Sequence, residues 1–126
     1  MSLAQLIDEL NPQQKQAATT ESKHSLVLAG AGCGKTKTIV ARAAYLIDQG
    51  VPANQIQILT FTRRSASEIV ARVELALGDQ AKGLRASTFH TFCMYLLRRV
   101  PKAFGLEQFS IIDRDNCHEK YSDKIN

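Results

Sequence analysis

The sequence predicts an α/β fold in which a parallel sheet is flanked by helices. Short apolar runs alternate along the chain with longer segments whose apolar residues recur at helical spacing. This alternation is typical of a parallel sheet, because each helix returns the chain to the edge where the next parallel strand begins. With 126 residues, 44% of them apolar, the chain is expected to form one domain around one core.

The strands are predicted at short apolar runs that are bounded by turn-forming residues. They cover Ser25–Ala29, Gln55–Phe61, Leu84–Thr88 and Phe109–Ile112. Each of the first three strands is followed by a segment with apolar residues at helical spacing, which predicts three long helices. These helices begin near Lys35, Thr62 and Phe89, and they end at Gly50, Gly78 and Pro101.

A shorter helix is predicted ahead of the first strand. It begins at Pro12 and runs to about Thr20, with Asn11 as its N-cap, and we expect it to lie beside the first strand. In the second long helix, Ser65 and Glu68 have the spacing of a capping box.

Composition excludes several classes of protein. The three cysteines are odd in number and form no CxxC pair, which argues against a disulfide framework and a zinc site and favours the reducing cytoplasm. No apolar run approaches the roughly 20 residues that a membrane span needs, and the start of the chain lacks the basic residues of a secretory signal. We therefore expect no membrane partner, while a net charge of +4 is compatible with a polyanionic one.

A phosphate-binding loop is predicted where the first strand meets the first long helix. Ala29-Gly-Ala-Gly-Cys-Gly-Lys-Thr36 matches the pattern GxxxxGK[ST], except that Ala29 replaces the first glycine. Glycines allow successive N–H groups to turn inward around an anion, and the positive end of the following helix adds to the attraction. Lys35 would neutralise the outer phosphates and Thr36 would hold magnesium. The alternative, a glycine-rich turn without a ligand, does not require this strand-to-helix position.

The order of four motifs resembles UvrD/Rep-type superfamily-one DNA helicases. The motifs are Leu10-Asn-Pro-Gln-Gln14, Ala29 to Thr36, Leu59-Thr-Phe-Thr62 and Ser87-Thr-Phe-His90, and the resemblance covers residues 10–113. It implies a P-loop NTPase fold, with the chain forming the N-terminal part of a RecA-like ATP-binding domain. It also implies ATP and Mg²⁺ as cofactors, and single-stranded DNA, junctions of single- and double-stranded DNA, and the remaining helicase domains as partners.

The resemblance assigns the adenine edge of ATP to Gln14, whose amide suits bidentate pairing with adenine. A solvent-facing helix residue is the alternative for this glutamine. Lys35 and Thr36 take the catalytic positions, and Thr36 the metal position. The residues expected to contact the nucleotide are Gln14, Ala29, Gly30, Ala31, Gly32, Cys33, Gly34, Lys35, Thr36 and Lys37.

The same resemblance assigns contacts with single-stranded DNA to Phe61, Thr62, Arg63, Thr88, Phe89 and His90. Ligands of parallel sheets bind outside the carboxyl ends of the strands, so Ala29, Phe61 and Thr88 are expected at one shared edge. Phe61 would stack on bases, and hydroxyl groups nearby would hold phosphates.

Several of these residues also have structural interpretations. Phe61 and Phe89 would equally serve as core residues, and His90 would equally cap or pack against its own helix. Arg63-Arg64 stands where the family usually has Asn-Lys, and two arginines at a helix start also suit solvated surface.

ATP hydrolysis in the resembling family requires an Asp-Glu pair after a later strand, which this chain lacks. Asp113 follows an apolar run, but Arg114 stands where the glutamate would be. We therefore expect a truncated domain, residues 1–126, that binds nucleotide without appreciable hydrolysis. Two alternatives stay open, namely a small phosphotransferase of the phosphate-loop type and a non-enzymatic nucleotide-binding module.

Overall fold

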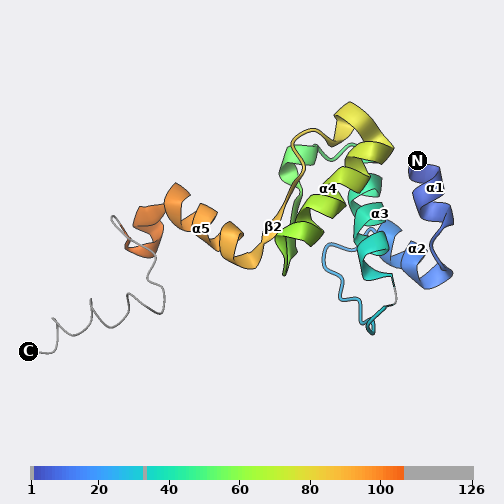
Figure 1. Ribbon diagram of the computed structural model, residues 1–126, viewed down its shortest axis with the longest axis horizontal. Coiled ribbons are helices and arrows are strands. Elements are labelled where there is room, and N and C mark those ends of the chain that lie inside the picture. The colour runs from blue at the N-terminus through green and yellow to red at the C-terminus, as the bar shows by residue number, and fades with distance from the viewer. Residues whose placement is uncertain (1, 33, 107–126) are drawn as a thin grey trace, which may run out of the picture. The chain divides into compact units, whose positions relative to one another are not determined.

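The computed structural model describes residues 2–32 and 34–106 (Figure 1). Contacts between residues divide the chain into two compact units, residues 1–92 and 93–126. The predicted strand at 109–112 and the neighbouring Asp113 lie outside the described residues. In chain order the elements are α1 (Leu3–Asp8), α2 (Pro12–Thr19), α3 (Lys35–Asp48), η1 (Ala53–Gln55), β1 (Gln57–Thr60), α4 (Arg63–Leu77), η2 (Gly78–Ala81), β2 (Arg85–Thr88), α5 (Phe89–Arg99) and η3 (Pro101–Phe104).

Helix α2 starts as the sequence predicts. Asn11 Oδ1 accepts a hydrogen bond from the Gln14 N–H at 2.8 Å, and Gln14 Oε1 accepts one from the Asn11 N–H at 3.0 Å. This reciprocal pair is a capping box, and Pro12 takes the first helical position, where its missing N–H costs nothing. Helix α1, which was not predicted, begins with the same device at Ser2 and Gln5.

The sheet consists of the two strands β1 and β2, which run parallel and are joined through α4. Gln57 pairs with Arg85 and Thr60 pairs with Thr88, so the two strands end side by side. Both strands lie within the ranges predicted from the sequence, and α4 and α5 begin within one residue of their predicted starts. The result is a helix-rich structure with a small parallel sheet, compatible with an α/β fold.

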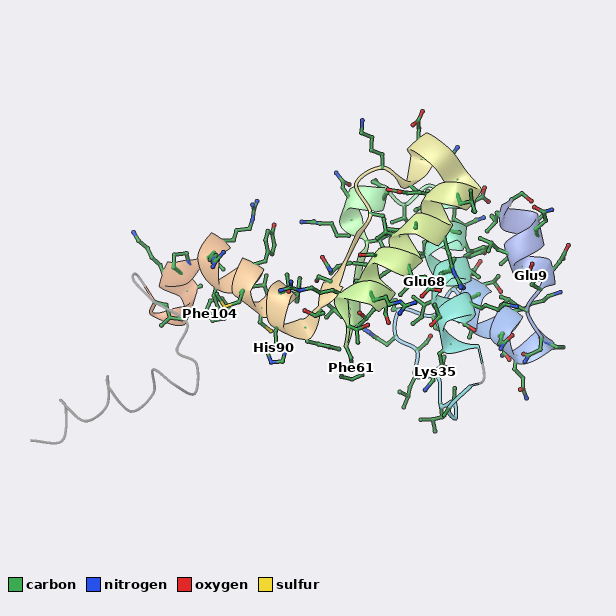
Figure 2. The ribbon with its side chains drawn as sticks, in the orientation of Figure 1. Glu9, Lys35, Phe61, Glu68, His90 and Phe104 are labelled. Carbon is green, nitrogen blue, oxygen red and sulfur yellow. The ribbon has the colours of Figure 1, made fainter. Side chains whose placement is uncertain are left out.

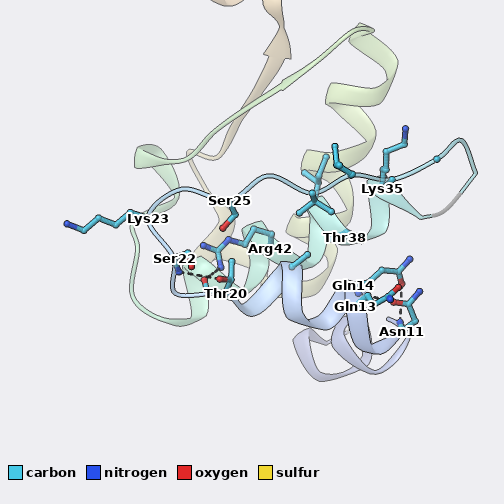
Figure 3. A pocket seen from close by; sticks show the side chains of 16 residues that line it. Asn11, Gln13, Gln14, Thr20, Ser22, Lys23, Ser25, Lys35, Thr38 and Arg42 are labelled. Carbon is cyan, nitrogen blue, oxygen red and sulfur yellow. Dashed lines mark hydrogen bonds between the residues drawn. The ribbon is translucent and has the colours of Figure 1, made fainter.

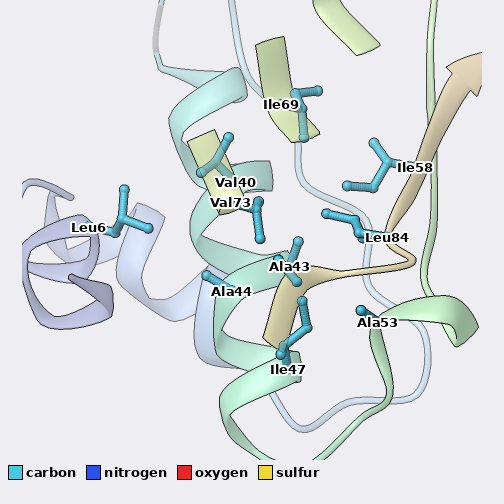
Figure 4. Packing of buried hydrophobic residues seen from close by; sticks show 11 residues of the cluster. Leu6, Val40, Ala43, Ala44, Ile47, Ala53, Ile58, Ile69, Val73 and Leu84 are labelled. Atoms are coloured by element: carbon cyan, nitrogen blue, oxygen red, sulfur yellow. The ribbon is translucent and has the colours of Figure 1, made fainter. Parts of the chain in front are cut away.

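The core of residues 1–92 lies among α3, α4 and the sheet (Figure 4). Helix α3 contributes buried residues at i, i+3, i+4 and i+7, the stripe expected of a helix with one apolar face. From α4, Ile69 and Val73 meet this stripe, while Ile58 of β1 and Leu84 beside β2 complete the contact. The stripe on α3 consists of Val40, Ala43, Ala44 and Ile47.

The predicted first strand, Ser25–Ala29, is wrong for this structure. The segment has no strand hydrogen-bonding pattern and belongs to an open loop between α2 and α3 (Figure 1). Leu26 and Leu28 are 85% and 87% exposed. A strand exists only when a neighbouring strand pairs with its N–H and C=O groups, and among the described residues only β1 and β2 pair in this way. Helix α2 lies against α3, not beside a strand as predicted.

The predicted capping box at Ser65 and Glu68 is also wrong. Thr62 is the N-cap of α4, and its Oγ1 accepts a hydrogen bond from the Ser65 N–H at 3.1 Å. Glu68 instead pairs with Arg72 one turn further along α4. The cap falls on Thr62 because β1 ends at Thr60, which leaves Thr62 in extended backbone directly before the first helical residue.

Within residues 93–106, the second half of α5 carries Arg98 and Arg99 in its last turn, where cations complement the helix dipole. The Arg99 guanidinium lies 5.9 Å from the centre of the Tyr95 ring, a cation–π contact. Gly105 then adopts a left-handed conformation with φ 67° and closes η3. In the described parts of the chain, no helix combines the length and apolar character that crossing a bilayer requires.

Candidate functional site

The glycine loop ends at the first residue of α3. Gly34 occupies the N-cap with φ 74° and ψ 30°, a left-handed conformation that favours glycine. As a glycine it brings no side-chain oxygen to the first N–H groups of α3, which the helix itself leaves without acceptors. Thr38 stabilises this turn, since its Oγ1 donates to the Gly34 carbonyl at 3.0 Å. The start of α3 thus combines N–H donors, the positive end of a 14-residue helix and the cation of Lys35.

Gln14 lies against this turn. A Cβ atom added to Gly34 would come within 2.7 Å of Gln14 Nε2, closer than such atoms normally approach. The Gln14 amide is held there from its other end, because its Oε1 accepts the Asn11 N–H. Two predicted nucleotide residues that are 20 positions apart are therefore neighbours, and glycine at position 34 leaves the space that the glutamine fills.

A cavity of about 690 Å³ opens between α2, α3 and the loop that joins them (Figure 3). Along α3 it is lined at i, i+3, i+4 and i+7 from Lys35, which places Thr38, Ile39 and Arg42 on the same face as Lys35. Figure 3 shows Lys35 and Gln14 on the same side of this lining, with Lys23 on the opposite side. A cavity of this size suits a nucleotide-sized ligand.

The structure brings together part of the predicted nucleotide set. Gln14, Ala29, Gly30 and Lys35 line the cavity, whereas Ala31, Gly32, Gly34, Thr36 and Lys37 do not, and Cys33 lies outside the described residues. Lys37 Nζ instead lies 3.5 Å from Glu9 Oε2, across from the end of α1. This ion pair is half exposed, so its contribution to stability is small.

Thr36 fits a magnesium site in part. It stands in the first turn of α3 directly after Lys35, and a hydroxyl oxygen is a ligand of the kind that Mg²⁺ prefers. Among residues 2–32 and 34–106, no three His, Cys, Asp or Glu side chains gather as a metal-ligand group. Mg²⁺ bound with nucleotides usually takes most of its ligands from phosphate oxygens and water.

The predicted DNA-binding residues gather where β1 and β2 end. Phe61 directly follows β1 and Phe89 directly follows β2, and their ring centres lie 5.5 Å apart with a 39° tilt. Phe61 is 91% exposed and Phe89 45% exposed, so the pair is not part of the core. Figure 2 shows Phe61 projecting outward from the sheet end. An exposed pair of rings at this spacing forms an aromatic surface on which a base can stack.

The hydroxyl groups beside the two rings form hydrogen bonds at the starts of α4 and α5. Thr62 Oγ1 caps α4, and Thr88 Oγ1 accepts a hydrogen bond from the Thr91 N–H at 3.3 Å. Arg63 is the first residue of α4 and His90 is the second residue of α5, and both are exposed. Ala29, by contrast, is not at a strand end, so the single edge expected for both ligands is not formed by this sheet.

Sequence reasoning missed Arg42. Its Nη1 donates to the main-chain carbonyls of Ala18 at 3.1 Å and Thr20 at 2.6 Å, and the side chain also lines the cavity. The spacing of seven residues from Lys35 was the available signal, because it places both side chains on one face of α3.

Comparison with known proteins matches the UvrD/REP helicase N-terminal domain to residues 10–126. The chain is 41% identical over 110 residues to the ATP-dependent DNA helicase PcrA of Staphylococcus epidermidis and 40% identical over 110 residues to that of Staphylococcus aureus. In both comparisons the match covers 86% of this chain, and the chain spans about 15% of the length of the relative. The family match takes in both the cavity and the strand ends, and this chain therefore belongs to the UvrD/REP helicase N-terminal domain family.

Proposed function

We propose that this chain is the ATP-binding portion of a DNA helicase. The whole protein would couple ATP hydrolysis to movement along single-stranded DNA and to strand separation at junctions of single- and double-stranded DNA. The observation that carries the proposal is the placement of Gln14 and Lys35 on one cavity, with Gln14 packed against the turn that precedes Lys35. The name of the relatives, ATP-dependent DNA helicase, supports the same function. The whole protein would work in the cytoplasm, because three cysteines without a CxxC pair suit a reducing compartment.

In this proposal the cavity holds ATP, with the adenine at Gln14 and the phosphates at Lys35. The Gln14 amide would pair with the adenine edge, which offers one donor and one acceptor. Lys35 and the N–H groups at the start of α3, with Ala29 to Gly34 around them, would bind the phosphates, and Thr36 would contribute its hydroxyl to the Mg²⁺ that accompanies them. Lys37 would add a second cation on releasing Glu9.

Single-stranded DNA would lie across the ends of β1 and β2. Phe61 and Phe89 would stack on bases, while the exposed Arg63 and His90 and the N–H groups near Thr62 and Thr88 would contact the phosphate backbone. Stacking tolerates any base, which suits a protein that moves along DNA regardless of sequence.

The isolated chain would bind nucleotide without appreciable hydrolysis. Among the described residues no three His, Cys, Asp or Glu side chains gather as a metal-ligand group, and the acidic pair that orients water would come from the rest of the helicase. A brisk, DNA-stimulated ATPase activity of these 126 residues would contradict this part of the proposal.

Nucleotide binding is tested with Lys35→Ala and with Lys82→Ala as a charge-matched control, since Lys82 is exposed and does not line the cavity. Calorimetric titration with Mg-ATP should show a loss of about tenfold or more in affinity for Lys35→Ala, because one cation facing phosphate is removed. Lys82→Ala should bind as the unchanged chain does. Equal loss in both variants, or no binding by the unchanged chain, would overturn the proposal.

DNA binding separates the helicase from its two alternatives. Fluorescence anisotropy of a labelled single-stranded oligonucleotide should show binding that weakens as salt rises, because phosphate contacts release counterions. A small phosphotransferase would instead pass phosphate from ATP to a small acceptor. A non-enzymatic nucleotide-binding module would bind ATP without any response to the oligonucleotide.

A further inference from the structure

Besides a small apolar cluster, two contacts join helix α2 to α3, in the same order along both helices. Near the start of each, Gln14 packs against Gly34. The second contact is made by Arg42, which lies two turns into α3. Its Nη1 donates to the carbonyls of Ala18 and Thr20 at the end of α2. Two separated contacts fix the direction of one helix on another more firmly than either contact does by itself.

The second contact satisfies carbonyl groups at the C-terminal end of α2. The last carbonyls of a helix have no partners within it, and α2 has no basic residue of its own in its last turn. Arg42 supplies both the donors and the positive charge from the neighbouring helix, where its planar guanidinium reaches two carbonyls at once. Its bond to Thr20 also anchors the residue at which the loop toward the glycines begins.

Apolar packing between the two helices is modest. The small cluster beside Arg42 contains the buried residues Leu10, Ala18 and Ala41, with Ile7 packed against it. Two of the three buried members are alanines, which bury little apolar area but let the helix backbones approach closely. Close approach allows the Arg42 side chain to reach main-chain carbonyls, and the limited area makes that polar contact important for the placement of α2.

We infer that Arg42 is a positioning residue for base recognition: it holds α2 so that Gln14 stays against Gly34, within reach of a nucleotide whose phosphates lie at Lys35. This inference rests on the proposed function. Arg42 acts on the adenine end through α2, while Lys35 and the start of α3 hold the phosphates without it. Loss of Arg42 should therefore weaken binding of the base and leave binding of the phosphates unchanged.

The test measures the affinity of Mg-ATP and of Mg-tripolyphosphate, which carries the phosphates without a base. Arg42→Met keeps an unbranched apolar side chain but removes the donors, and should weaken ATP about tenfold, as expected for loss of a hydrogen-bonded contact, with tripolyphosphate changed less than about twofold. Gln14→Ala should do the same. The double variant should bind ATP no more weakly than either single variant, because both changes act through the same contact, that of Gln14 with the base.

Arg72→Met is the matched control, since Arg72 makes a half-exposed ion pair on α4 and should leave both affinities unchanged. Equal weakening of ATP and tripolyphosphate by Arg42→Met, or losses that add in the double variant, would overturn the inference. If Arg42→Met does not fold, Arg42→Lys replaces it in the same cycle; its ammonium keeps the charge and should give a smaller loss confined to ATP, and an equal loss for both ligands would again overturn the inference. Failure of the unchanged chain to bind either ligand would instead refute the proposed function.

Discussion

Replacing Gly34 with alanine tests how the glycine loop is built. Gly34 has φ 74°, and an alanine there would suffer the left-handed penalty of about 1–2 kcal/mol. The added methyl group would also lie 2.7 Å from Gln14 Nε2 and push the amide away. Displacement of Gln14 breaks its bond to the Asn11 N–H, which contributes about 0.5–1.5 kcal/mol. Together these effects should lower the free energy of unfolding by about 2 kcal/mol.

Gly30→Ala is the matched control in the same loop. A Cβ atom at Gly30 has no neighbour within 4 Å, and its φ is not in the left-handed region. Its free energy of unfolding should change by less than about 0.5 kcal/mol. Urea unfolding followed by far-UV circular dichroism gives both values, and thermal unfolding should show a fall of about 10 °C in Tm for Gly34→Ala. Equal stability of the two variants would refute the assigned conformation of Gly34 and its contact with Gln14.

Three further predictions concern the core, a cap and the aromatic pair. Ile69 is 2% exposed and should lose about 2–5 kcal/mol of unfolding free energy on change to alanine. Leu75→Ala, at a residue 71% exposed, should cost far less in the same urea titration, and similar values would contradict the described core. Thr62→Ala should destabilise the chain by about 1 kcal/mol through loss of the α4 cap, whereas Glu68→Gln should change Tm very little, and the reverse ranking would restore the rejected capping box. Phe61→Ala should weaken binding of a single-stranded oligonucleotide by about 1–3 kcal/mol with Tm nearly unchanged, so a large fall in Tm would show that the ring is structural.

Local signals in the sequence predicted most of the helices and both strands of the sheet. Asn11 and Pro12 mark the start of α2 because a side-chain oxygen and a missing N–H suit those two positions in any protein. The apolar stripe of α3 predicted its buried face, since that spacing fits the turn of a helix. The start of α3 at Lys35 was likewise readable from the glycines before it.

Choices between similar local signals were harder. Thr62 and Ser65 both have hydroxyl groups that suit a helix N-cap, and the sequence alone favoured the second of them. The end of β1 decides between them, because the N-cap must be the extended residue directly before the helix. Arg42 shows the same limitation, since its acceptors lie 22 and 24 residues earlier in the chain.

By itself, the sequence predicted most of the helices, both strands of the sheet and the family, because helix starts and helical spacing depend on neighbouring residues and the family on the order of its motifs. Tertiary structure decided which segments pair and which side chains meet. Ser25–Ala29 has the apolar run of a strand, yet it stays unpaired with β1 and β2, because a strand is defined by the hydrogen bonds of a neighbour. Gln14 and Gly34, likewise, became neighbours only through the packing of α2 against α3, a contact that no local pattern encodes.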